Sequence, residues 1–278
     1  MTRDDVRTRI RGLVRLLSLD ALVIVSGVVV YFGVRGLTAE NPERAREHAL
    51  DILALEKTLG LDVEAGVQAV LLDLHWVTTL ANWVYIWGHW PVIAVTFVWL
   101  ALRNRVVFRR LRNAMIASGA LGLCVYTTYP VAPPRLLHDG YVDTITEQSN
   151  AYRVLQPPAF TNQYAAMPSL HVGWDLLVGL AIAAAAGTLI MRTLGRLMPA
   201  LMAAATVITA NHYVLDALVG AAFALVGYAV ALDLEKRRER HQAPAAAVDL
   251  SPPALPRPRG AGEGRLPDAP RSTRAPAS

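Results

Sequence analysis

The sequence is poor in cysteine and in charged residues. Cys124 is the only cysteine among 278 residues, which excludes an internal disulfide and a zinc site built from cysteines. Charged residues make up 18% of the chain, whereas soluble domains carry about 25%. Hydrophobic residues make up 54%, and the mean hydropathy is +0.33. Because the hydrophobic residues are gathered in long runs, the sequence argues against a soluble enzyme and against a disordered protein.

Most of the apolar runs reach or approach the roughly 20 residues that a helix needs to cross the hydrocarbon core of a membrane. Together they predict an all-α, polytopic membrane protein with a bundle of six transmembrane helices. In the second run, the stretch Gly88-His89-Trp90-Pro91 could be a loop between two helices, but the positions of the basic residues favour one long helix bent at the proline. The runs are Leu17–Gly36, Thr79–Leu102, Ala114–Tyr129, Leu170–Leu189, Leu197–Ala210 and Tyr213–Leu232.

The basic residues indicate the orientation, because loops rich in lysine and arginine stay in the cytoplasm. Such segments precede the first run, follow the second, fourth and sixth runs, and are sparse elsewhere. An even number of crossings therefore separates Arg15 from Arg103, which requires the second run to be one span. We expect a plasma-membrane protein with both termini in the cytoplasm. The pI near 9.6 follows from this topology, and no nucleic-acid partner is expected.

The composition divides the chain into three parts. Residues 1–78 hold the first span and the stretch Glu43–Leu61, where apolar residues recur at helical spacing. This amphipathic stretch predicts either an interfacial helix on the outer leaflet or a helix that caps the bundle. Residues 79–232 form the membrane core. Residues 233–278 are rich in alanine, proline and arginine, which predicts a disordered cytoplasmic tail.

Ionisable residues near the spans are candidates for function, because burying them in a membrane is costly. In the six-span scheme His171 begins the fourth span and His212 precedes the sixth, both on the extracytoplasmic side. Asp216 lies one helical turn after His212, where its carboxylate can orient the imidazole and raise the basicity of the other nitrogen. That nitrogen could act as a nucleophile or a base. From this spacing alone, a structural hydrogen bond is the alternative.

The segment Met167–His171 predicts the start of a helix that can bind an anion. Ser169 can cap this helix and is, with Arg135, a candidate substrate-binding residue, because the free backbone N–H groups of a first turn attract phosphate. His171 is placed there to protonate the leaving oxygen of a phosphate ester. Arg135 follows two prolines and offers a planar guanidinium to phosphate oxygens. The alternatives are a capped helix with an interfacial histidine and a solvated arginine.

Three further polar residues lie in or near the runs. For His89 we expect a hydrogen bond between helices, with a place in an acceptor or headgroup pocket as the alternative. Asp175 lies one turn after His171 and either pairs with it or faces a cavity. Asp20 is expected at the cytoplasmic interface.

Three motifs, in this order, resemble the type-2 phosphatidic acid phosphatase superfamily. The resemblance covers roughly Thr79–Leu232 and looks closest to the inositol phosphorylceramide synthase-like branch, whose members share M-P-S-L-H and H-Y-x-x-D. The motifs are Pro133-Pro134-Arg135, Met167-Pro168-Ser169-Leu170-His171 and His212-Tyr213-x-x-Asp216-x-x-x-Gly220.

This resemblance implies a fold and a mechanism. Six helices would hold an outward-facing active site whose chemistry needs no metal or other cofactor. His212 would form a phosphohistidine, and Asp216 would orient it. His171 would protonate the leaving group, and Arg135 would bind phosphate oxygens.

The sequence departs from the broad superfamily pattern, K-x6-R-P … P-S-G-H … S-R-x5-H-x3-D. Thr128 stands where the pattern has lysine, and Thr206 stands where it has arginine. Two cations that would stabilise phosphate are therefore missing from their usual positions. Arg153 is a candidate replacement for one of them.

The sequence thus predicts an integral membrane lipid phosphate phosphatase or phosphotransferase that works at the extracytoplasmic face. Its partners would be a membrane lipid substrate and, for transfer, a small polyol acceptor such as inositol. Two alternatives stay open. His171, His212 and Asp216 could bind the metal of a metal-dependent hydrolase. The chain could also be a lipid-binding or scaffold protein without activity.

Overall fold

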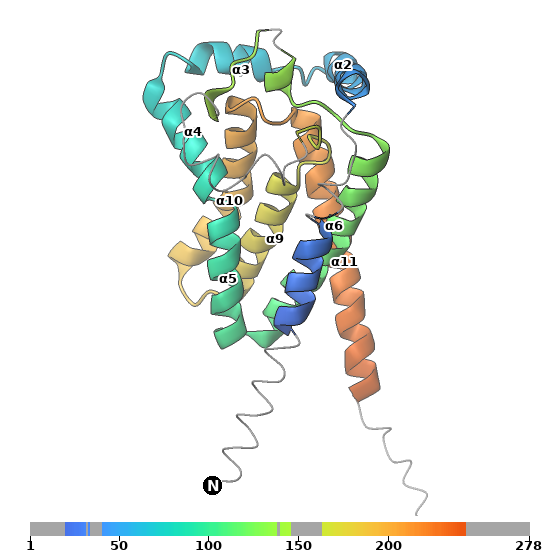
Figure 1. Ribbon diagram of the computed structural model, residues 1–278. Helices are drawn as coiled ribbons and strands as arrows, with labels where there is room; N and C mark the ends of the chain where they lie inside the picture. The colour runs from blue at the N-terminus through green and yellow to red at the C-terminus, as the bar shows by residue number, and fades with distance from the viewer. Residues whose placement is uncertain (1–19, 32, 34–40, 138–139, 146–162, 243–278) are drawn as a thin grey trace, which may run out of the picture.

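The computed structural model describes residues 20–31, 33, 41–137, 140–145 and 163–242. Arg153 and the tail beyond Gln242 lie outside the described residues. Within them every regular element is a helix (Figure 1), so the predicted all-α class is confirmed. The helices are Asp20–Tyr31, α2 (Pro42–Leu59), α3 (Glu64–Leu71), α4 (His75–Trp87), α5 (Trp90–Arg103), α6 (Arg105–Thr128), the 3-10 turn η1 (Pro134–Leu136), α9 (Leu170–Ala185), α10 (Leu189–Ile208) and α11 (Val214–Gln242).

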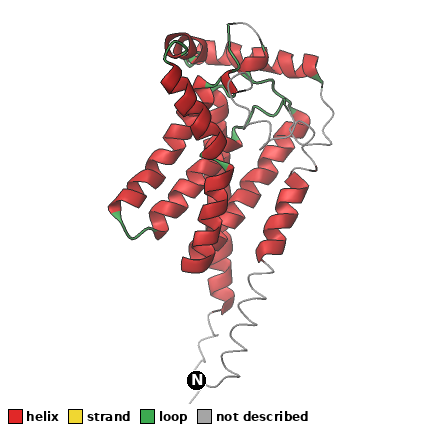
Figure 2. Cartoon of the chain, turned by 60° about the vertical axis from the view of Figure 1, so that its left-hand side comes forward, coloured by secondary structure: helices red, strands yellow, loops and turns green. Residues whose placement is uncertain are grey.

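Helices α2 and α3 lie across one end of the bundle that the long helices form (Figures 1 and 2). Asn41 caps α2 by accepting from the N–H of Arg44 at 3.1 Å, and Gly60 ends it at a φ of 70°. The apolar face of α2 packs on Val131 and Tyr213. The stretch therefore packs as a helix that caps the bundle, and its position at the outer leaflet stays a prediction.

The second apolar run is two helices and not one continuous helix. α4 ends at Trp87, α5 begins at Trp90, and their axes differ by 46°. The break falls at Gly88 and His89. Pro91 is not its cause, because it sits in the first turn of α5, where no intrahelical bond needs its missing N–H.

Length and hydropathy qualify one described helix as a membrane span, Val214–His241 in α11, with mean hydropathy 2.0. The bent pair α4 and α5 qualifies together, whereas Asp20–Tyr31 and α9 are apolar but shorter. The six-span arrangement therefore stays a prediction. α11 also continues past the expected boundary at residue 232, so residues 233–242 are helical and not part of a disordered tail.

The start of α6 and the end of α11, both rich in arginine, lie at the end of the bundle away from α2 and α3 (Figure 1). Asp20, which we expected only at an interface, forms ion pairs with Arg105 at 2.5 Å and with Arg112. Arg110 Nε lies 2.9 Å from Oε2 of Glu235. The starts of the first described helix and of α6 and the end of α11 thus lie together, as the charge pattern predicts.

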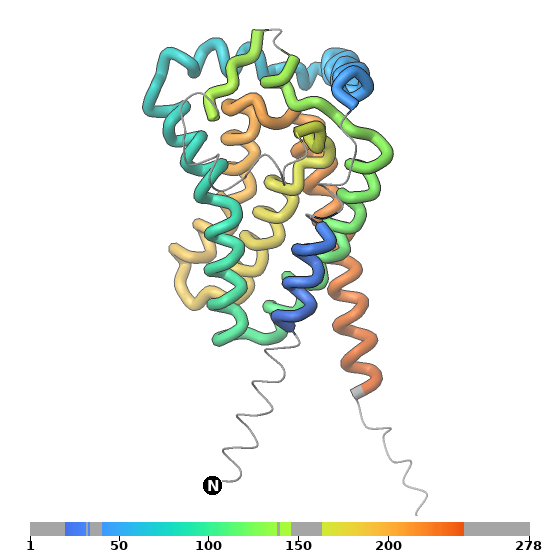
Figure 3. The backbone as a smooth tube through the Cα atoms, viewed as in Figure 1, coloured from blue at the N-terminus to red at the C-terminus, as the bar shows by residue number. Residues whose placement is uncertain are grey.

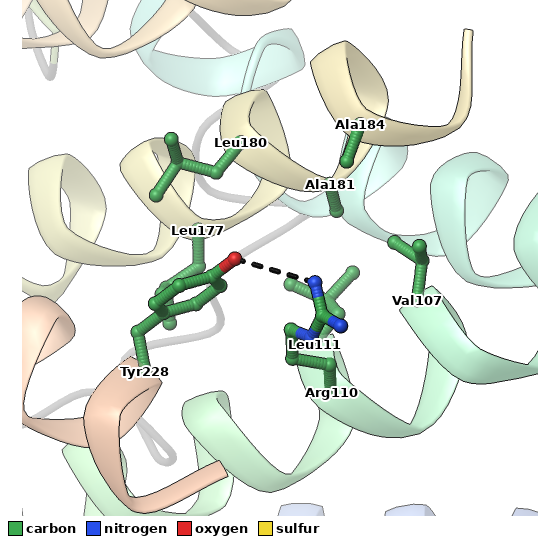
Figure 4. A pocket seen from close by; sticks show the side chains of 8 residues that line it. All are labelled: Val107, Arg110, Leu111, Leu177, Leu180, Ala181, Ala184 and Tyr228. Atoms are coloured by element: carbon green, nitrogen blue, oxygen red, sulfur yellow. Dashed lines mark hydrogen bonds between the residues drawn. The ribbon is translucent and has the colours of Figure 1, made fainter. Parts of the chain in front are cut away.

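A small cavity of about 10 Å³ lies beside these ion pairs, between α6, α9 and α11 (Figure 4). Arg110 extends toward Tyr228 there, and its Nη1 donates to the Tyr228 hydroxyl at 3.5 Å. A cavity of this size holds about one water molecule. It is therefore too small to be a substrate site.

Helices α9 and α11 cross in backbone contact near their first turns. A Cβ atom on Gly220 would lie 2.1 Å from the carbonyl oxygen of Ser169, and one on Gly173 would lie 2.5 Å from that of Gly220. Neither distance is possible for a real side chain, so both positions need glycine. Small residues permit such close crossings in membrane bundles.

We predict that Gly220→Ala lowers the free energy of unfolding by about 1–3 kcal/mol, the usual cost of overpacking. Gly66→Ala in α3 is the matched control, because a Cβ there meets nothing within 4 Å. Thermal unfolding in detergent measures both variants. Equal midpoints for the two would contradict the close crossing of α9 and α11.

Candidate active site

His171 and His212 face each other at the end of the bundle that α2 and α3 cover. His171 lies in the first turn of α9, and His212 lies in the connection between α10 and α11. Their ring centroids are 5.5 Å apart. Figure 3 shows how the chain brings these two distant segments together beneath α2. The two histidines that the sequence singled out therefore share one site.

The imidazole of His212 is held through its Nδ1 atom. This atom lies 2.8 Å from the carbonyl oxygen of Ala166 and 3.5 Å from Oδ2 of Asp216. A carbonyl oxygen only accepts hydrogen bonds, so Nδ1 carries the proton and Nε2 keeps the lone pair. Nε2 is therefore the nitrogen that can attack an electrophile. The closer orienting contact is a backbone carbonyl, which the sequence did not predict.

Asp216 lies in the first turn of α11 and is fully buried. Its Oδ2 accepts from the backbone N–H of Tyr213 at 3.0 Å. We expected His212 and Asp216 on one face of a continuous helix, but α11 begins only at Val214. The chain turns at Ala210, whose φ of 52° is left-handed. The pair is thus adjacent through a turn and not through helical spacing.

Ser169 has the capping role that the sequence predicts. Its Oγ accepts from the N–H of Val172 at 3.5 Å, and its own N–H donates to the carbonyl oxygen of Asp216 at 2.9 Å. The side chain is fully buried. Contact between Ser169 and a phosphate stays a prediction.

Arg135 lies beside the connection that carries His212. Its backbone N–H donates to the carbonyl oxygen of Ala210 at 2.9 Å, which ties η1 to this connection. Its Nε lies 3.3 Å from Oδ2 of Asp143. A phosphate bound by Arg135 would therefore compete with a carboxylate.

The two positions where the pattern expects cations hold hydroxyl groups that bond within their own helices. Thr128 Oγ1 donates to the carbonyl oxygen of Cys124 at 2.7 Å, and Thr206 Oγ1 donates to that of Ala203 at 2.8 Å. Neither threonine supplies positive charge to the site.

A second histidine–carboxylate pair lies behind His171. His89 Nδ1 is 2.8 Å from Oδ1 of Asp175, and both residues are buried. The hydrogen bond between helices expected for His89 is confirmed, and it gives Asp175 its partner. The His171 ring contacts Tyr85 and His89, with ring centroids 4.5 and 4.4 Å away. The break between α4 and α5 at Gly88 and His89 places His89 there.

Among the described residues, no three histidine, cysteine, aspartate or glutamate side chains gather closely enough to hold a metal ion. The alternative in which His171, His212 and Asp216 bind a metal together thus gains no support from this geometry.

A model of the PAP2 superfamily matches residues 50–230, which is more than half of the chain. The chain belongs to the PAP2 superfamily. The match includes Arg135 and the turns that carry His171 and His212. PAP2 superfamily proteins are generally phosphatases and typically membrane proteins. Comparisons with curated proteins and with solved structures found no match.

We predict that His89→Phe lowers the free energy of unfolding by about 3–5 kcal/mol, because it leaves the buried carboxylate of Asp175 without its partner. The double variant with Asp175→Leu removes both polar groups and should be more stable than His89→Phe alone. A double-mutant cycle of denaturant unfolding measures the coupling. Strictly additive losses would contradict a direct bond between the two residues.

Proposed function

We propose that this PAP2 superfamily protein cleaves phosphate esters of membrane lipids through a phosphohistidine formed on His212. The observation that carries the proposal is the approach of the His171 ring to His212, whose Nε2 keeps its lone pair. Membership of the superfamily supports a phosphatase-type activity. The motifs shared with the inositol phosphorylceramide synthase-like branch support transfer to an alcohol as a second outcome.

The reaction has two steps. In the first, Nε2 of His212 attacks phosphorus, the bond from phosphorus to the lipid oxygen breaks, and His171 protonates that oxygen. Asp216 offsets the positive charge on the imidazole, and Arg135 neutralises the phosphoryl oxygens. In the second step water or a polyol hydroxyl attacks phosphorus and gives its proton to His171. Inorganic phosphate or a polyol phosphate leaves, and His212 is restored.

An apolar cavity supports a lipid substrate. It measures about 360 Å³ and lies between the helix Asp20–Tyr31, α5, α6 and α9. Trp90 and Trp174 line it, and their rings lie 5.1 and 6.2 Å, between centroids, from His89, which contacts His171. A hydrocarbon chain in this cavity would thus begin close to the proposed leaving-group acid.

The proposed site faces the extracytoplasmic side of the plasma membrane. The support is the charge distribution, because the basic segments lie at the opposite end of the bundle and such segments stay in the cytoplasm. A lipid headgroup would then reach the site from the outer leaflet.

We predict that His171→Gln lowers kcat/KM for phosphatidic acid, which reports only the steps up to departure of the alcohol, by about 10²–10⁴-fold, the usual contribution of a general acid. The loss should be far smaller for p-nitrophenyl phosphate, because nitrophenolate leaves without a proton. His212→Ala should abolish turnover of both substrates. Equal losses on both substrates in His171→Gln would contradict its role as the acid.

Incubation of the purified protein with radiolabelled phosphatidic acid, with and without inositol, separates the two outcomes. We predict label in inorganic phosphate when water is the acceptor, and in inositol phosphate when transfer occurs. Neither product should form with His212→Ala. Unchanged turnover in that variant would favour the scaffold or lipid-binding alternative, and loss of activity in EDTA would favour the metal-dependent one.

A further inference from the structure

Three buried carboxyl groups meet the first turn of α11. The N–H groups at a helix start have no partners within the helix and must find them elsewhere. Here Leu215 N–H donates to Glu56 Oε1 at 2.6 Å, and Val214 N–H donates to Glu64 Oε1 at 2.7 Å. Asp216 Oδ2 accepts from the N–H of Tyr213. Glu56 and Glu64 come from α2 and α3, so the two helices that cover the site also hold the start of α11.

Glu56 and Glu64 are fully buried, although glutamate is rarely buried without a charged partner. Each glutamate uses Oε1 to accept from the start of α11, and Oε2 of each is buried without a hydrogen-bond partner. Two ionised carboxylates offer only acceptors, whereas a proton on one of them supplies the donor that these buried oxygens lack. The positive end of the α11 dipole favours the remaining negative charge. Burial and the lack of a donor for the two Oε2 atoms therefore favour one proton on the pair.

The N–H groups that Glu56 and Glu64 bind lie close in the chain to His212, the proposed nucleophile. These two N–H groups belong to the residues that follow His212 and Tyr213 in the chain. Asp216, which contacts the His212 ring, lies in the same helical turn. A shift of this turn would move both the ring of His212 and its carboxylate neighbour.

We infer that Glu56 and Glu64 are positioning residues for His212, and that the proton they share sets an alkaline limit to activity. The inference rests on the proposed function for its link to activity. When the pair loses its proton, two buried negative charges repel each other, and the contacts of Glu56 and Glu64 with the start of α11 weaken. The added negative charge also opposes the binding of a phosphate.

The surroundings of Glu56 place this alkaline limit near pH 8. Burial, followed by the nearby charge of Glu64 and then Asp216, raises the pKa of Glu56 from 4.5 to about 8, although its bond from Leu215 N–H acts in the opposite direction. The other titratable groups facing this place are the phenol of Tyr213, with Tyr141 near it, and the imidazole of His212. The neighbouring acids Glu64 and Asp216 favour the protonated form of Glu56.

The test compares Glu56→Gln with Glu47→Gln. Glutamine at position 56 can accept from Leu215 N–H and donate to Glu64, so it reproduces the protonated state at every pH. Glu47→Gln makes the same chemical change at an exposed position of α2. The first measurement is kcat/KM for phosphatidic acid between pH 6 and 10, as rough limits within which the pKa falls.

We predict that activity of the wild type and of Glu47→Gln falls about tenfold between pH 7 and pH 9, as one deprotonation near pH 8 requires. Glu56→Gln should keep its activity at pH 7 within about threefold and shift the alkaline limb upward, because its hydrogen bonds are retained. An alkaline limb that is the same in all three proteins would overturn the inference and assign the limb to another group, such as His171.

A second measurement does not depend on activity. Because the pKa of Glu56 is raised in the folded state, its contribution to stability is present at low pH and is lost as the pH rises through about 8. The unfolding midpoint of the wild type should therefore fall more than that of Glu56→Gln between about pH 6 and pH 9. Parallel midpoints would overturn the proton-sharing pair. If the wild type shows no phosphatase or transferase activity while its unfolding midpoint still diverges from that of Glu56→Gln, only the proposed function is overturned.

Discussion

The site depends on the backbone contact between the first turns of α9 and α11. One hydrogen bond, from Ser169 N–H to the carbonyl oxygen of Asp216 at 2.9 Å, joins the two turns, and Gly220 leaves the space for it. His171 follows Ser169 closely in the chain, and His212 shortly precedes Asp216. The backbone contact between the two turns therefore sets how far apart the two rings lie.

The sequence predicts well those features that come from hydrophobic periodicity and from motif order. The helical class and the grouping of Arg135, His171 and His212 near one another follow from such patterns. The sequence does not predict contacts made by backbone groups, because these carry no residue signature. The carbonyl oxygen of Ala166 beside His212 is of this kind.

Glu56 and Glu64 show a different limit of the sequence. In the amphipathic stretch Glu56 resembles the other charges, which lie on the solvent face. One signal was available, because Glu56 continues the spacing of the buried residues Ala45, Ala49 and Ile52 along the same face of α2. Nothing local identifies its partner, since Glu56 bonds to Leu215, a residue 159 positions away.

The most direct test of the account is a structure of the protein with orthovanadate, an anion that takes the trigonal geometry of a transferred phosphoryl group. The account predicts vanadium bonded to Nε2 of His212, with His171 at the opposite apical oxygen and Arg135 beside the equatorial ones. Vanadium bonded elsewhere, or His171 turned away from the bound anion, would contradict it.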